Sequence, residues 1–97
     1  MVASGGYFTW ANSEAGFADS IAANVSSTET LSADNSVALF DATGATVDQV
    51  AWGTGTNQYV EGTAYPTDPT ASQVLMRQSA NGALVDTDNN ASDFAIQ

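Results

Sequence analysis

The most informative stretch of this sequence runs from Ser36 to Trp52 and is SVALF-DATG-ATVDQVAW. Two segments with apolar residues at every second position, 36–40 and 45–52, flank the loop 41–44. The loop begins with Asp41 and ends with Gly44, the residue types that a tight turn favours. Because a period of two is typical of β-strands, the stretch predicts an antiparallel β-hairpin.

The predicted hairpin has one anomalous position. Val37 and Leu39 share a face of the first strand, and Val50 and Trp52 share a face of the second. Asp48 has the same parity as Val50 and Trp52, although carboxylates are rarely found on an apolar face. We therefore expect either a β-bulge that redirects Asp48 or a position at the margin of the sheet.

The rest of the chain predicts short strands joined by polar loops. Aromatic and β-branched residues indicate further strands at 6–11, 73–77, 84–85 and 93–96. Residues 15–22 have helical spacing, so a short helix there is an alternative to a loop. With no internal repeat and no linker, residues 1–97 predict a single domain.

The composition excludes several classes of function. The chain has 97 residues and a formal net charge of -10, with eleven acidic residues, one basic residue and no His or Cys. This charge disfavours binding to nucleic acid and to anionic membranes. Without His, Cys or Lys, no serine or threonine can be activated by a neighbouring base, so we expect no enzyme. No apolar run is long enough to span a membrane.

The N-terminus and the surface composition predict the setting of the domain. Residues 1–6 have neither the basic nor the apolar region of a signal peptide, and we expect the chain to be a fragment of a larger protein. A pI of about 4.1 and a surface rich in Ser, Thr and Asn suit an extracellular or cell-surface protein, although a halophile's cytosol would suit them too.

Several segments, taken in order, resemble the lamin tail domain in its bacterial form. They are GGYF and AN at residues 5–8 and 11–12, LSADNSVAL at 31–39, DATGATVDQVAWG at 41–53, LMR at 75–77 and DTDNNASDF at 86–94. The resemblance implies an all-β fold, an antiparallel immunoglobulin-like sandwich with long irregular loops. It also implies that one or two N-terminal strands of the family are missing here.

Missing strands leave open sheet edges, which invite pairing with another chain. We expect a homodimer, a strand swap, or closure by a differently ordered sheet. The family occurs in secreted and cell-surface proteins, so the resemblance implies a non-catalytic accessory module for attachment or domain–domain contact. Its partner would be a protein or a cell-surface component.

Two alternatives would make the chain a ligand-binding module. Asp86, Asp88, Asn90 and Asp93 offer oxygen atoms at closely spaced positions, as calcium requires. Ala91 and Gln97 stand where an EF-hand needs Gly and Glu, so only a generic calcium loop is possible, and a turn held by Asp and Asn side chains is the simpler interpretation.

The second alternative is a glycan platform formed by Trp52, Tyr59 and Tyr65, because aromatic rings stack on sugars. The simpler interpretation is that Trp52 fills the core and the tyrosines anchor the loop. Arg77, the single cation, predicts a structural ion pair with one or two carboxylates.

Overall fold

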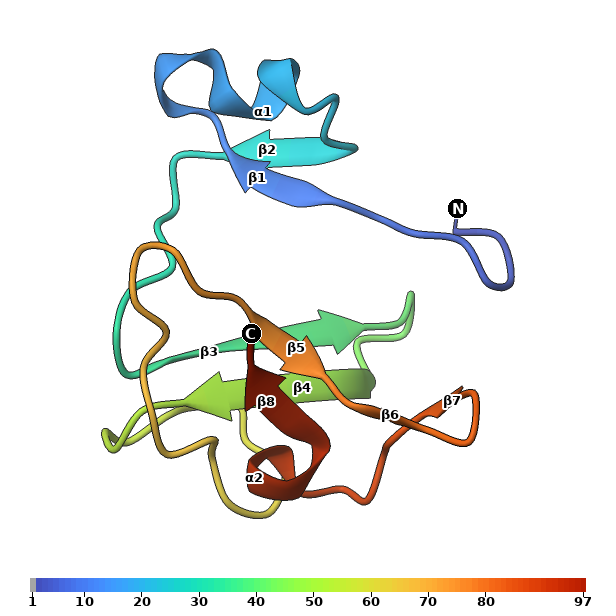
Figure 1. Ribbon diagram of the computed structural model, residues 1–97. Coiled ribbons are helices and arrows are strands. Elements are labelled where there is room, and N and C mark those ends of the chain that lie inside the picture. The colour runs from blue at the N-terminus through green and yellow to red at the C-terminus, as the bar shows by residue number, and fades with distance from the viewer. Residues whose placement is uncertain (1) are drawn as a thin grey trace. The chain divides into compact units, whose positions relative to one another are not determined.

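A computed structural model describes residues 2–97, which form two compact units divided between Thr30 and Leu31 (Figure 1). Strands outnumber helices over residues 2–97 as a whole, and the helices are single turns, which confirms the prediction of a strand-rich fold. Within residues 2–97 every sheet has only two strands, and none closes into a barrel. The immunoglobulin-like sandwich therefore stays a prediction.

The N-terminal unit contains β1 (Trp10–Asn12), the 3₁₀ turn η1 (Glu14–Gly16), α1 (Phe17–Ser20) and β2 (Val25–Ser27). β1 and β2 pair in parallel, so the expectation of purely antiparallel strands is wrong here. The reason lies in the connection, because η1 and α1 form the crossover that a parallel pair needs. The strand predicted at 6–11 overlaps β1 only at its end.

A small apolar interior holds the N-terminal unit together. Ala11 of β1 and Ala18 of α1 are its buried apolar residues. The indole Nε1 of Trp10 donates a hydrogen bond to Oγ of Ser27, 3.0 Å away, which ties β1 to β2. Small side chains let the helical turn approach the two strands closely, but they contribute little buried apolar area.

The C-terminal unit contains the remaining elements. They are β3 (Asn35–Phe40), β4 (Thr46–Trp52), β5 (Leu75–Arg77), β6 (Ser79–Ala80), β7 (Ala83–Leu84), α2 (Asn90–Asp93) and β8 (Phe94–Ile96). β3 pairs with β4, β5 with β8, and β6 with β7, and all three pairs are antiparallel. Two of them, β3–β4 and β5–β8, form the walls of the site described below.

The β3–β4 hairpin confirms the prediction made from residues 36–52. Oδ1 of Asp41 accepts hydrogen bonds from the backbone N–H and the hydroxyl of Thr43 and from the N–H of Ala45. The Thr43 hydroxyl in particular lowers the pKa of the Asp41 carboxyl. Gly44 has a φ of 86°, which a residue with a side chain rarely adopts. The sequence of the loop thus specifies the turn.

The hairpin ladder explains the position of Asp48. The register shifts between Leu39 and Phe40, so that Val47 has no partner on β3 and forms a bulge. Asp48 nevertheless pairs with Leu39, on the same face as the Val37–Val50 pair. The bulge does not turn this carboxylate away from the apolar face, and the compensation comes instead from Arg77, as described below.

The opposite face and the outer edge of β4 are covered by the loop 53–65 and by α2. Ala51 is completely buried there. Asn90, also completely buried, accepts hydrogen bonds from the N–H groups of Ala51 and Glu61 and donates one to the carbonyl of Gln49. Because one side chain satisfies three backbone groups, Asn90 fastens the loop and α2 to the hairpin.

Candidate functional site

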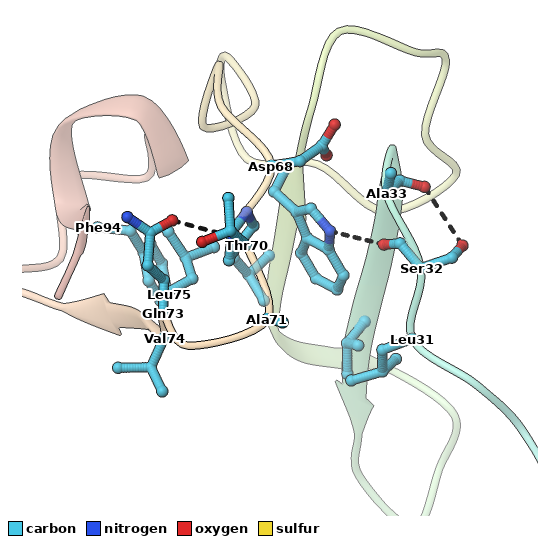
Figure 2. A pocket seen from close by; sticks show the side chains of 14 residues that line it. Leu31, Ser32, Ala33, Asp68, Thr70, Ala71, Gln73, Val74, Leu75 and Phe94 are labelled. Atoms are coloured by element: carbon cyan, nitrogen blue, oxygen red, sulfur yellow. Dashed lines mark hydrogen bonds between the residues drawn. The ribbon is translucent and has the colours of Figure 1, made fainter.

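A groove lies between the β3–β4 hairpin and the β5–β8 pair and has a volume of about 640 Å³. Val37, Val50 and Trp52 line it from the hairpin, and Leu75 and Phe94 line it from the β5–β8 pair. Figure 2 shows Leu31, Ser32 and Ala33 on one side and Thr70, Leu75 and Phe94 on the other. The volume lies within the range of about 300–1,000 Å³ that is common for ligand sites.

The groove leaves large apolar side chains open to solvent. Leu31 is 51%, Val74 54% and Val37 40% exposed, and all three belong to its lining. Covering one such half-exposed side chain stabilises a complex by about 1 kcal/mol. Other large apolar side chains of residues 2–97 are exposed as well, but these three combine exposure with a place in the lining of one groove, which is typical of an interaction site.

Trp52 and Asp68, which both line the groove, are held in place by hydrogen bonds. The Trp52 indole donates to the carbonyl of Ser32 at 2.9 Å, which fixes the ring in the wall. Oδ1 of Asp68 accepts the N–H of Asp34, and Oδ1 of Asp34 accepts the N–H groups of Thr54 and Gly55. These bonds hold the acidic residue Asp68 at the groove lining.

Gly53 is required by the same network. Its φ is 90°, and a Cβ atom there would clash with the side chains of Asp34 and Asp68. Both the backbone conformation and the close approach therefore exclude other residues. The loop that follows β4 is shaped by this glycine and returns to pair with Trp52 through Tyr65.

Arg77 of β5 lies among three carboxylates. Its Nη2 is 2.9 Å from Oδ1 and 3.0 Å from Oδ2 of Asp48, and its Nη1 is 3.3 Å from Asp86 and 3.7 Å from Asp93. The guanidinium also stacks on the ring of Phe94, with 4.6 Å between its carbon and the ring centroid. Arg77 is only 14% exposed, so its charge acts in a partly desolvated place.

Asp93 is the most enclosed member of this group. Burial raises the pKa of its carboxyl, but hydrogen bonds from the hydroxyl and N–H of Thr87 and from the N–H of Asn89, together with Arg77, outweigh that effect. The pKa therefore lies below its usual range, and Asp93 is charged at neutral pH. This carboxylate stabilises the turn before α2 by accepting backbone donors.

Glu61 completes an acidic cluster with Asp86 and Asp93. One carboxylate oxygen from each residue lies within 4.8 Å of the other two. Oε2 of Glu61 is buried without a hydrogen-bond partner. Burial, followed by repulsion from Asp48, Asp86 and Asp88, raises the pKa of Glu61. Both effects make the charged form of this carboxyl less favourable than it is in water.

The four residues predicted for calcium are not brought together as a set. Asp86 and Asp93 join the acidic cluster, whereas Asp88 is not among its members. The side-chain oxygen of Asn90 is already bonded to two backbone donors. Three carboxylates can contribute to a cation site, but calcium collects six to eight oxygens, and Arg77 already lies against two of the three.

The three aromatic residues predicted for a glycan platform have separate roles. Trp52 is buried in the groove wall, which leaves little ring surface for a sugar. Tyr59 packs edge-on against Phe40, with ring centroids 5.6 Å apart. Tyr65 is half-buried and pairs with Trp52 through its backbone.

Sequence reasoning singled out Asp48 but did not predict its pairing with Arg77. It also missed the place of Glu61 in the acidic cluster and the apolar lining of the groove. A signal existed for Asp48, because its parity placed a carboxylate on an apolar face and Arg77 was the single available cation. No local signal existed for Glu61, which lies in a Gly-rich loop and meets Asp86 and Asp93 only after folding.

No protein-family model, curated protein or solved structure matches this chain. The resemblance to the lamin tail domain therefore stays a prediction. Among residues 2–97, no helix has the length and apolar character needed to cross a membrane.

Proposed function

We propose that this chain is a non-catalytic interaction module that binds a protein partner in the apolar groove of its C-terminal unit. The observation that carries the proposal is the exposure of Leu31, Val37 and Val74 around one groove. Fifteen large apolar side chains of residues 2–97 are exposed, and these three differ from the rest because they line one concave groove. An exposed apolar lining of this kind supports a surface that a partner covers. The absence of His, Cys and Lys from the sequence supports a binding role over a catalytic one.

The proposed setting is a larger secreted or cell-surface protein to which this module is attached. The acidic composition supports this setting, since a net charge of -10 keeps an extracellular domain soluble. The lamin-tail-like segments support the same role as an accessory domain. In this setting the groove would provide the contact with a neighbouring domain or with a second protein.

An uncharged apolar dye tests the proposal without electrostatic interference. Nile red should bind the wild-type protein and gain fluorescence, because the groove offers an apolar environment. Leu31→Ser and Val74→Ser should each weaken this signal severalfold. Leu84→Ser is the matched control, because Leu84 is 70% exposed on β7 and does not line the groove.

Equal dye fluorescence from all four proteins would contradict the proposal, provided that circular dichroism shows the same fold for each. The glycan alternative makes a different prediction. A saturable change in tryptophan fluorescence with a polysaccharide, unaffected by Leu31→Ser, would support a carbohydrate-binding module instead. The calcium alternative is tested by the titration described in the Discussion.

A further inference from the structure

The two edges of the β3–β4 hairpin are unequal. On the outer edge of β4, the N–H of Ala51 donates to Asn90 and its carbonyl accepts from Tyr65. The carbonyl of Gln49 accepts from Asn90, and the N–H of Gly53 donates to Tyr65. These bonds close the β4 edge, so that no further strand can pair there.

The same bonds reveal which backbone groups point outward from β3. Because the N–H and carbonyl of Ala51 point away from β3, the Ser36–Ala51 pair is a non-hydrogen-bonded pair of the ladder. The backbone groups of Ser36 and Ala38 therefore also point outward. The N–H of Ser36 is bonded to the side chain of its neighbour Asn35. Within the C-terminal unit, residues 31–97, the carbonyl of Ser36 and both backbone groups of Ala38 have no partner.

β3 also lacks the features that protect an edge strand. Monomeric proteins protect such edges with lysine, proline, an inward-pointing charge or a bulge. β3 has the sequence NSVALF, with no charge and no proline, and the bulge of the hairpin lies on β4. An unprotected edge of six residues is long enough to accept a strand from another chain.

The groove continues directly from this edge. Val37, at the centre of β3, and Leu31 and Ala33, just before it, line the groove. A strand added beside β3 would continue the hairpin sheet, and every second side chain would point to the Val37 face. Apolar side chains at those positions would cover part of the exposed lining of the groove.

The charge of the chain determines which partner is favoured. Eleven acidic residues stand against one basic residue, and that residue, Arg77, is already bonded to Asp48. Asp68 adds a carboxylate to the groove lining itself. A second copy of this chain would bring another charge of -10 to the interface, whereas a strand with Lys or Arg at its ends would be attracted.

We propose that the open edge of β3 pairs with an extended segment of a partner protein, whose alternate residues are apolar and whose ends carry Lys or Arg. The segment adds a third strand to the hairpin and places its apolar side chains in the groove. This inference rests on the proposed function, because it specifies how the groove is used and by which chemistry.

The proposal is tested with a capped octapeptide of the sequence Lys-Thr-Val-Thr-Val-Thr-Val-Lys. The peptide is titrated into the full ¹⁵N-labelled chain, and the NMR chemical shifts of the protein are measured. Saturable shifts should centre on β3 and on the groove lining, and the N–H of Ala38 should become protected from hydrogen exchange. Ala38→Pro removes that donor at an edge position where proline is tolerated, and it should weaken binding about tenfold.

Two N-methylated peptides separate strand pairing from apolar contact. One peptide is methylated on the backbone nitrogens of its three valines, and the other on the backbone nitrogens of its three threonines. In an added strand, the backbone N–H groups of only one of these two sets point toward β3. The peptide methylated on that set should bind about tenfold more weakly than the unmethylated peptide, and the other methylated peptide should bind as well as the unmethylated one. A peptide with Glu in place of both lysines should also bind about tenfold more weakly at low salt, and the difference should shrink at high salt.

Any result that differs from these expectations contradicts a specific part of the proposal. If both N-methylated peptides bind like the parent peptide, strand pairing is wrong but the groove remains a binding site. If no peptide binds although Nile red does, the strand partner is wrong. If neither peptide nor dye binds, the proposed function fails as well. If the Glu peptide binds equally well, the assigned charge is wrong, and a dimer of the protein alone would identify a second copy as the occupant.

Discussion

At the scale of single residues, the most consequential side chain is Arg77. It compensates the carboxylate that the hairpin places on its apolar face, and it also approaches Asp86 and the fully buried Asp93. Exposed ion pairs contribute little to stability, but removing the cation beside a fully buried carboxylate such as Asp93 costs more. The pairing of Arg77 with Asp48 also keeps the β5–β8 pair close to the hairpin.

Replacing Arg77 by Ala should destabilise the protein by about 2–4 kcal/mol, because the fully buried carboxylate of Asp93 would lose the cation beside it. Thermal unfolding followed by circular dichroism measures the effect. Arg77→Lys is the control, since it keeps the charge but loses the two bonds to Asp48, and its melting temperature should lie between the other two. A melting temperature unchanged in Arg77→Ala would show that the cation is not needed.

Glu61 should make the stability depend on pH. Its pKa is raised above the ordinary 4.5, so the folded state holds this proton more tightly than the unfolded state. The stabilisation is fully present below the ordinary value and is lost as pH rises through the raised value. Glu61→Gln should therefore raise the melting temperature at pH 7 by a few degrees, with little effect at pH 4.

Glu29 provides a control for this experiment, because it is an exposed glutamate of the N-terminal unit. Glu29→Gln removes one carboxylate of the same type, and the effect of Glu61→Gln is measured against it at each pH. Asp41 and Asp93 act in the opposite direction, because their pKa values are lowered in the folded state. The stability that they contribute is present above the ordinary pKa of 3.8 and is lost as the pH falls below it and through the lowered values. If Glu61→Gln lowers the melting temperature at neutral pH, the charged carboxylate must be favourable, which contradicts the raised pKa.

At the scale of elements, the hairpin could be predicted and the pairing of the N-terminal strands could not. The alternation in residues 36–52 and the Asp and Gly of the loop specify β3 and β4 locally. The β1–β2 pair depends on contacts between residues 15 positions apart, such as Trp10 with Val25, and no periodicity in either three-residue strand encodes them. Short strands carry too few residues for a pattern to be visible.

The segment 86–93 illustrates the same limit for the candidate site. Its composition predicts calcium ligands or a self-bonded turn, and both interpretations use the same residues. Asn89 caps α2 with its side chain, and Asp93 accepts bonds from Thr87 and Asn89. Arg77 and Glu61, which are distant in the sequence, lie beside Asp86 and Asp93 in the folded chain. The sequence of the segment contains no sign of these two neighbours.

Calcium should not stabilise this segment specifically, because the guanidinium of Arg77 already lies beside two of the three clustered carboxylates. Calcium and magnesium at equal millimolar concentrations should shift the melting temperature equally. A rise of several degrees with calcium alone would support the calcium alternative. Asp86→Asn then locates the site, since a calcium effect at the acidic cluster should disappear in this variant.

At the scale of the whole molecule, the net charge of -10 opposes folding. Repulsion among exposed carboxylates is screened by salt, so the melting temperature should rise steadily between about 10 mM and 500 mM NaCl. Thermal melts across this series measure the effect. The Arg77→Ala variant should show a steeper rise, because it lacks the single compensating cation. A melting temperature that falls with salt would mean that attractive pairs outweigh the repulsion.

The outer edge of β4, whose backbone groups are already hydrogen-bonded, limits the assemblies that this hairpin can form by strand pairing. A strand that is open on both sides can template an endless stack, in which each newcomer offers a fresh edge. Here the Asn90 amide and the Tyr65 backbone occupy the outer edge of β4, so each copy of the hairpin has one open edge only. Two copies that paired through β3 would leave no open edge between them, so self-association of this hairpin would end at a dimer and not continue to a fibre.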